Sequence, residues 1–364
     1  MPPPPSLVLR SAQTASEFSA VKEQWKNPDD ILTVLMIIGD VVKAALAQLT
    51  SSDPRPFTPV AFSFGWVAFS FSTILSVMGS RRLVPDPDCR CTLIDVKMGY
   101  PRDVSSWVLA RLVRDYEPSN TGTGLEVAFF GTVKDKRTGV PERDWVYYLG
   151  ACIILLQLIL AALPGVLDGN WTIMIITCAG TLLAQIQGAL PQWRKELWNA
   201  RKIEPNKREV VCLTRGNGSS YVMVISSEGD EVYPKLKLAD IAGGREVCSK
   251  ETTYATFVLV VLWFAHLLTM QGVESGHWYT LAIGAAGMLQ NVIAAGARRD
   301  PSALGFHLEH YHTVHQNKVF EALKEAEERE RRVGFVLLDI FFPGGLMPLE
   351  EQWKERKKEE YKQK

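Results

Sequence analysis

The sequence predicts an α-helical integral membrane protein, with about six transmembrane helices and a small discontinuous α/β cap on the cytoplasmic side. Three observations predict this class. Apolar residues make up 47% of the 364 positions and gather in long blocks. Basic residues fall almost entirely on alternate connections between the blocks, and short β-branched runs occupy those same connections.

Six apolar blocks are each about 19–23 residues long, which is enough to cross ~30 Å of hydrocarbon. Ordinary helices of soluble proteins average nearer ~11–12 residues, so buried helices of a large soluble protein are the less favoured alternative. The predicted membrane helices are 31–50, 57–79, 145–165, 171–190, 254–272 and 278–297.

The distribution of Lys and Arg predicts which side each connection faces, because basic residues stay on the cytoplasmic side. Nearly all of them fall in four segments, whereas the three opposite turns hold only Arg55. We therefore expect a multi-pass protein, in the endoplasmic reticulum membrane, with both termini cytoplasmic. The four cytoplasmic segments are 1–30, 80–144, 191–253 and 298–364, and the helix pairs between them span 31–79, 145–190 and 254–297.

The cytoplasmic segments contain strand and helix signals that predict the cap. An amphipathic helix is expected at 103–117, with Asp103 as its N-cap, and a charged helix at 318–334. The apolar stretch 335–345 is too short to span a bilayer and should be interfacial or packed. Strands are expected at 91–98, 125–133, 209–215 and 220–227, with the Asn-Gly pair of RGNGSS turning between the last two.

Polar residues inside membrane helices are costly and are functional candidates by default. Asp40 and Gln157 lie midway along their helices, and the other amides lie in the cytoplasmic halves of theirs. If these side chains face a common interior, they form a polar cavity that opens toward the cytoplasm. The predicted substrate-binding amides are Gln157, Gln185, Gln290 and Asn291.

Asp40 has two interpretations. A carboxyl group in an apolar pocket stays protonated near neutral pH and can act as a general acid. An ion pair with Lys43, three residues along the same helix face, is the favoured alternative. Asp339 and Glu309 are further, less favoured candidates for a catalytic acid.

Aromatic residues crowd the second and fifth predicted helices. Aromatic faces stabilise cations, so Trp66, Phe69 and Trp263 are predicted to line a site that could hold a carbocation. Packing against lipid or within the core is the commoner explanation of such residues.

The stretch GFHLEHYHTVHQ places four histidines within nine positions, at His307, His310, His312 and His315. Neither helical nor strand spacing gathers three of them on one face. No metal is therefore expected, and the stretch is predicted to be a connector or strand of the cap. A metal-dependent membrane enzyme would depend on these histidines.

Several sequence motifs are absent, among them the phosphate-binding GxxxxGK[ST] loop, the dinucleotide GxGxxG loop and DDxxD clusters that hold magnesium-diphosphate. We expect no cofactor and no nucleic-acid partner. An enzyme acting on a prenyl chain would start by protonation rather than by loss of diphosphate.

Three stretches resemble a large family of fungal integral membrane proteins: TPVAFSFGWVAFSFSTILSVMG (58–79), SSWVLARLVRDY (105–116) and KVFEALKEAEERERRVGFVLLDIFFPGG (318–345). Some members resemble membrane-bound terpene cyclases of meroterpenoid biosynthesis, in secondary metabolism. The resemblance implies an isomerase that closes a ring on the prenyl chain of a hydrophobic prenylated aromatic molecule. The alternative is a non-enzymatic membrane scaffold or transport-related protein with a partner-binding cap.

Overall fold

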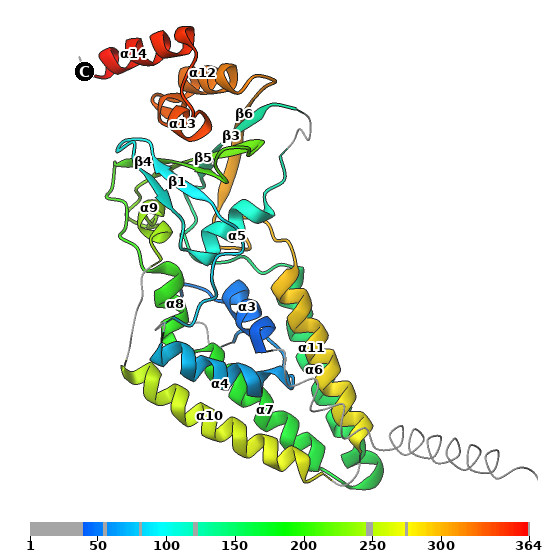
Figure 1. Cartoon of the computed structure of the whole chain (residues 1–364). Helices are drawn as coiled ribbons and strands as arrows, with labels where there is room; N and C mark the ends of the chain where they lie inside the picture. Colours follow the sequence, from blue (N-terminus) through cyan, green and yellow to red (C-terminus); the bar gives the residue numbers. More distant parts are fainter. Residues whose placement is uncertain are drawn as a thin grey trace, which may run out of the picture.

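The computed structural model describes residues 39–53, 57–79, 82–118, 123–244, 250–273 and 276–362. These residues form an elongated molecule with three regions: long helices at one end, a β-sheet in the middle, and helices α12 to α14 beyond the sheet (Figure 1). The predicted N-terminal segment 1–30 lies outside the described residues.

Three helices of the described chain are long and apolar enough to cross a membrane: α6 (Trp145–Asp168), α10 (Lys250–Gln271), and the stretch Thr172–Trp198, which contains α7 (Thr172–Gly188) and α8 (Pro191–Trp198). The 24 residues of α6 extend about 36 Å at 1.5 Å per residue. Large apolar side chains on these helices are exposed, which is expected for surfaces that face lipid. They include Leu155, Val166, Ile175, Phe257 and Leu268.

The helix predicted over 57–79 is wrong in its first part. Residues 57–64 contain no regular helix, and α4 (Gly65–Met78) has only 14 residues, too few to span a bilayer. Pro59 accounts for part of the difference, because it has no N–H to donate and disfavours helical backbone at Thr58.

Two other predicted membrane helices are helical where the structure describes them, but neither is confirmed as a membrane span. Within 31–50, the described part forms α3 (Gly39–Leu49), and 31–38 lies outside the described residues. The last predicted helix is α11 (His277–Gly296), which has 20 residues but is not among the three that are long and apolar enough.

The turn after α3 lies at the sheet end of the helices, on the same side as 80–144. Ser52 N–H donates to the carbonyl oxygen of Gly139 (2.8 Å), and the Gln48 amide donates to Ala297 at the end of α11 (3.0 Å). The prediction that this turn faces the opposite side is therefore wrong for 51–53.

The sheet is mixed and has six strands in the order β2-β1-β4-β5-β3-β6. Among the strands of the described residues, only β3 and β5 pair in parallel; the other neighbours are antiparallel, and β4 and β5 form the predicted hairpin. The histidine-rich stretch is strand β6, as one of its two interpretations predicted. The strands are β1 (Thr92–Asp95), β2 (Pro101–Asp103), β3 (Leu125–Thr132), β4 (Arg208–Thr214), β5 (Tyr221–Glu228) and β6 (Leu308–Gln316).

Both faces of the sheet are covered, which explains why β3 is a nearly continuous apolar run. Val127 and Phe129 face α12 (Val319–Arg329) and α13 (Val333–Phe341), whereas Ala128 and Phe130 face the core shared with the long helices. The stretch 335–345 is therefore largely a packed helix. The last helix is α14 (Pro348–Lys362).

The amphipathic helix predicted at 103–117 is α5 (Trp107–Asp115), and Asp103 does not cap it because it lies in β2. A short helix, α9 (Leu238–Ala242), contacts β1.

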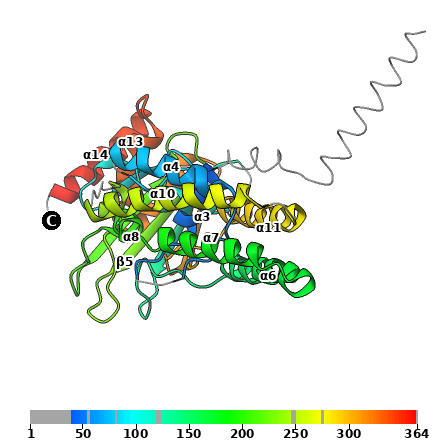
Figure 2. The same cartoon turned by 90° about the horizontal axis from the view of Figure 1, so that it is seen from below.

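The long helices pack around α3 and α4. Seen from below, α10 lies between α4 and α7, while α11 packs against both α6 and α3 (Figure 2). One hydrophobic core runs from these helices into α5 and one face of the sheet. The sheet is thus directly anchored on the helical body.

Glu209 on β4 predicts a pH dependence of stability. Its carboxylate accepts a hydrogen bond from Leu238 N–H (2.9 Å), and burial raises its pKa to about 7 from 4.5. Because the pKa of Glu209 is higher in the folded than in the unfolded protein, its contribution to the free energy of unfolding is complete below pH 4.5. That contribution is lost as pH rises past about 7. We expect the thermal midpoint to fall by a few degrees between pH 5 and pH 8, and expect Glu209→Gln to show a smaller fall. An equal fall in both proteins would exclude Glu209 as the cause.

Candidate functional site

The most unusual feature of the helical body is the irregular segment Phe57–Phe64, which forms neither helix nor strand, runs among the apolar helices and is called the extended segment below. Phe57 packs its ring against Tyr147 at the start of α6 (6.4 Å between centroids), and Phe62 reaches Gln157, ten residues further along α6. The chain then returns as α4. Backbone that is not helical can exist at membrane depth only where protein groups satisfy its hydrogen bonds.

Gln290 and Asn291 of α11 provide part of these hydrogen bonds. The Gln290 amide accepts from Ala61 N–H (2.9 Å) and donates to the Pro59 carbonyl (3.1 Å). Asn291 donates to the Ser63 hydroxyl (2.9 Å). Both side chains are almost completely buried.

Gln157 and Gln185 bind the same segment from α6 and α7. Gln157 donates to the carbonyls of Phe62 (2.7 Å) and Ile283 (2.8 Å), and Gln185 accepts from Thr58 N–H (3.1 Å). The structure thus brings all four predicted amides together, but around a peptide backbone. Their binding of a substrate stays a prediction.

Glycines create the space for the extended segment. A Cβ on Gly150 of α6 would overlap the Pro59 carbonyl oxygen, and one on Gly287 of α11 would overlap that of Phe62. A Cβ on Gly284 would overlap the Phe64 ring. Small residues at these positions allow close approach of backbones.

The predicted aromatic residues also come together. Trp263 lies between Trp66 and Phe62, with near-parallel rings at centroid distances of 5.8 and 6.1 Å, and Phe69 meets Trp66 edge-on. Trp66, Phe69 and Trp263 are each at most 1% exposed, so they form packed core. His266 also joins this cluster, edge-on to Phe62.

Two residues near this cluster were missed by the sequence analysis. His266 lies one helical turn after Trp263 on α10, a spacing that could have identified it. Glu196 of α8 is a buried carboxylate that accepts hydrogen bonds from the backbone N–H groups of Leu83 and Val84 (2.8 and 2.9 Å). Nothing in its local sequence, PQWRKELW, distinguishes it from a surface acid.

None of the three predicted catalytic acids contacts the aromatic cluster. Asp40 is exposed in the first turn of α3, although its neighbour Gly39 packs on the backbone of Phe69. Asp339 is exposed on α13 and pairs with Lys354 (2.5 Å), and Glu309 is exposed on β6.

The four histidines are spread along or beside β6. His307 is buried and hydrogen-bonds the Val140 carbonyl (3.0 Å), and burial lowers its pKa. His310 bonds the hydroxyl of Thr313 (2.6 Å), and His312 packs against Phe129. The described residues contain no group of three or more His, Cys, Asp or Glu side chains that could hold a metal ion.

A buried ion pair joins three helices beside the sheet. The Arg299 guanidinium, after α11, binds Asp144 in front of α6 through two hydrogen bonds (2.7 and 2.8 Å) and the Gln48 carbonyl of α3 through a third (2.5 Å). The Asp144 carboxylate also caps α6 by accepting from Tyr147 N–H (3.1 Å).

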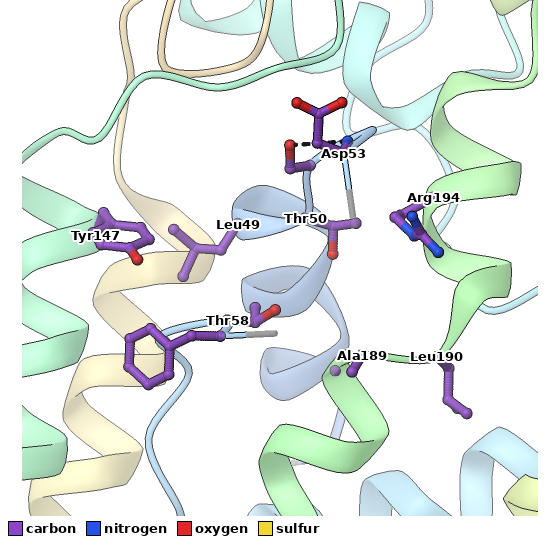
Figure 3. A pocket seen from close by; sticks show the side chains of 11 residues that line it. Leu49, Thr50, Asp53, Thr58, Tyr147, Ala189, Leu190 and Arg194 are labelled. Atoms are coloured by element: carbon purple, nitrogen blue, oxygen red, sulfur yellow. Dashed lines mark hydrogen bonds between the residues drawn. The ribbon is translucent and has the colours of Figure 1, made fainter. Parts of the chain in front are cut away.

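A cavity of about 240 Å³ lies where the extended segment enters the helices (Figure 3). Arg194 extends toward it from α8, and no hydrogen-bond or ion-pair partner of Arg194 exists among the described residues. The Asp53 carboxylate, hydroxyl groups and apolar side chains line the rest. They belong to the end of α3, the residues on either side of 54–56, α6, and the junction of α7 with α8: Leu49, Thr50, Ser51, Asp53, Phe57, Thr58, Tyr147, Gly188, Ala189 and Leu190.

This mouth cavity, defined by the residues named above, combines one cation, Arg194, one carboxylate, Asp53, and several hydroxyls with an apolar wall at the ends of the apolar helices. Such a lining suits the acidic head group of an amphiphile. In comparisons with protein families, with curated proteins and with solved structures, the chain shows no significant match.

Proposed function

We propose that the protein is a transport-related membrane protein that binds an amphipathic small molecule with an acidic or phenolic head group at the mouth cavity. The observation that carries this proposal is Arg194, a cation without an acidic partner in the described chain, beside the hydroxyls of Thr50, Thr58 and Tyr147. At about 240 Å³ the cavity accommodates a head group. The apolar chain would lie against the exposed side chains of the neighbouring helices.

The proposed topology has four crossing helices, α6, α7, α10 and α11, and one re-entrant unit formed by residues 57–78. This arrangement places all six strands on one side. We propose that this side is cytoplasmic, since it holds the basic segments 80–144 and 191–253, and that the membrane is that of the endoplasmic reticulum. A prenylated aromatic molecule, the ligand that the family resemblance implies, has the required polar head and apolar chain.

Replacement of Arg194 by Gln is expected to weaken binding of an acidic amphiphile about tenfold or more, because a charge-assisted hydrogen bond is lost. The measurement is saturation binding of radiolabelled oleate to the protein in nanodiscs of neutral lipid. Lys195→Gln removes the same charge from the adjacent, exposed position of α8 and should leave binding unchanged. An equal loss of oleate affinity in both variants, or the absence of saturable oleate binding, would refute the proposal.

Terpene cyclisation is the second candidate function, favoured by the contacts of Trp66 with Phe69 and Trp263 and of Trp263 with Phe62. In this proposal Asp40 protonates a terminal epoxide or alkene of the bound prenyl chain. Microsomes containing the protein would convert a prenylated, epoxidised aromatic compound to a cyclic isomer of unchanged mass. Asp40→Asn should abolish that conversion, and an active variant would remove Asp40 from the role.

A further inference from the structure

A second cavity, of about 410 Å³, lies on the sheet face that α12 and α13 cover. It opens between the start of β4, the end of β1, the turn that joins α12 to α13, and the last turn of α14. All four charged side chains that line it in the described chain are basic: Lys97, Arg208, Arg331 and Arg332. The remaining lining residues are two valines and Tyr361.

Three of these four cations are not neutralised. Arg208 is bound by both carboxylate oxygens of Glu330 (3.0 and 2.7 Å) and adds no net charge. In the described part of the chain, Lys97, Arg331 and Arg332 have no ion-pair partner. The cavity is therefore a concentrated positive site.

Two neighbouring acids are engaged with the backbone instead. Asp95 accepts hydrogen bonds from the backbone N–H of Lys97 and of Met98 (2.8 and 3.1 Å). Glu327 accepts from the backbone N–H of Arg332 and of Phe335 (2.8 and 2.9 Å). These contacts fix the loops that carry the basic side chains and leave the side chains themselves without an acid.

Tyr361 holds the two arginines in place. The guanidinium carbons of Arg331 and Arg332 lie 4.9 and 5.7 Å from the centre of its ring, and Phe335 packs edge-on against the ring (5.5 Å). Arg332 also donates to the Lys97 carbonyl (2.6 Å). Such stacking lowers the cost of ordering the cations when a ligand binds.

Unused hydrogen-bond donors remain in this arrangement. The Arg332 Nε and the Tyr361 hydroxyl are buried and have no hydrogen-bond partner in the described structure. Buried donors without an acceptor are unfavourable, and an acceptor-rich ligand would satisfy them.

We propose that this cavity binds the phosphate groups of a phosphorylated small molecule that carries two or more negative charges. Planar guanidinium groups match phosphate oxygens in pairs, and Lys97 adds a third positive charge. The long helices pack toward the other face of the sheet, which favours a soluble ligand over a lipid head group. This site is separate from the mouth cavity and does not depend on the function proposed there.

The test is isothermal titration of the full chain in nanodiscs of neutral lipid with inorganic pyrophosphate at pH 7. We expect one saturable site, and binding about tenfold or more weaker in the double variant Lys97→Gln, Arg331→Gln. The double variant Arg356→Gln, Lys358→Gln removes the same charge from α14 outside the cavity and should bind as the unaltered protein does. All four positions are exposed, so folding should be retained.

Several results would overturn the proposal. Equally weakened pyrophosphate binding in both double variants would indicate general attraction to positive charge. A titration whose heat does not saturate would indicate that no specific site exists. Stronger, competitive binding of a hexaglutamate peptide would identify an acidic protein segment as the occupant. Capture by vesicles of phosphatidic acid, reversed by pyrophosphate, would assign the site to a lipid head group.

Discussion

Replacing Gly287 by alanine is expected to destabilise the protein by about 3 kcal/mol or more, because the new methyl group would overlap the Phe62 carbonyl oxygen. The overlap is with backbone, which cannot rotate away as a side chain can. The Gln157 amide approaches the same position, so relief of the clash would also disturb its hydrogen bond to Phe62.

The control is Gly296→Ala, at the end of the same helix, where an added Cβ meets nothing within 4 Å. Alanine gains its full helix propensity only at the interior position 287, which would stabilise Gly287→Ala relative to Gly296→Ala. A larger loss in Gly287→Ala must therefore come from the contact with the extended segment. The measurement is the fraction that stays monodisperse in mild detergent as temperature rises. If Gly287→Ala and Gly296→Ala lose their monodisperse fraction at the same temperature, the extended segment does not pass close to α11.

Replacing Arg299 by Gln is expected to cost about 3–5 kcal/mol, because it leaves the Asp144 carboxylate without its cation in a largely enclosed site. The Arg299 side chain is 1% exposed and that of Asp144 is 17% exposed. The substitution also removes the hydrogen bond to Gln48, so the ends of α3, α6 and α11 lose their common partner.

Arg298→Gln supplies the comparison. Arg298 pairs with Glu117, and these side chains are 60% and 70% exposed, so the loss should be about 0–1 kcal/mol. Thermal melting in nanodiscs at pH 7 measures both variants. If the melting temperature falls as far in Arg298→Gln as in Arg299→Gln, burial of an ion pair does not determine its contribution to stability.

The parts of the fold that depend on repeating patterns could be predicted from the sequence. The apolar blocks identified α6, α7 and α10, and the β-branched runs identified β1, β3, β4 and β5. Strand order could not be predicted, because the partners of β3 come from segments about a hundred or more residues away.

The extended segment shows why the membrane part was only partly predicted. Residues 57–64 are as apolar as a membrane helix, and hydropathy does not distinguish backbone that is helical from backbone bound by distant amides. Pro59 was the local indication. Gln157, Gln185, Gln290 and Asn291 were identified as unusual, but their partner could be found only in three dimensions.

The extended segment also constrains how the protein is made. The Gln290 amide that pairs with Ala61 follows it by 229 residues, which the ribosome takes roughly 10 to 50 s to add. During that interval the peptide groups of Pro59 and Ala61 lack their final partners. In the proposed membrane topology, residues 57–64 therefore cannot settle among the helices as they leave the translocon. We therefore expect chains that stop before α11 to be retained by chaperones and degraded, even when every earlier helix has been inserted.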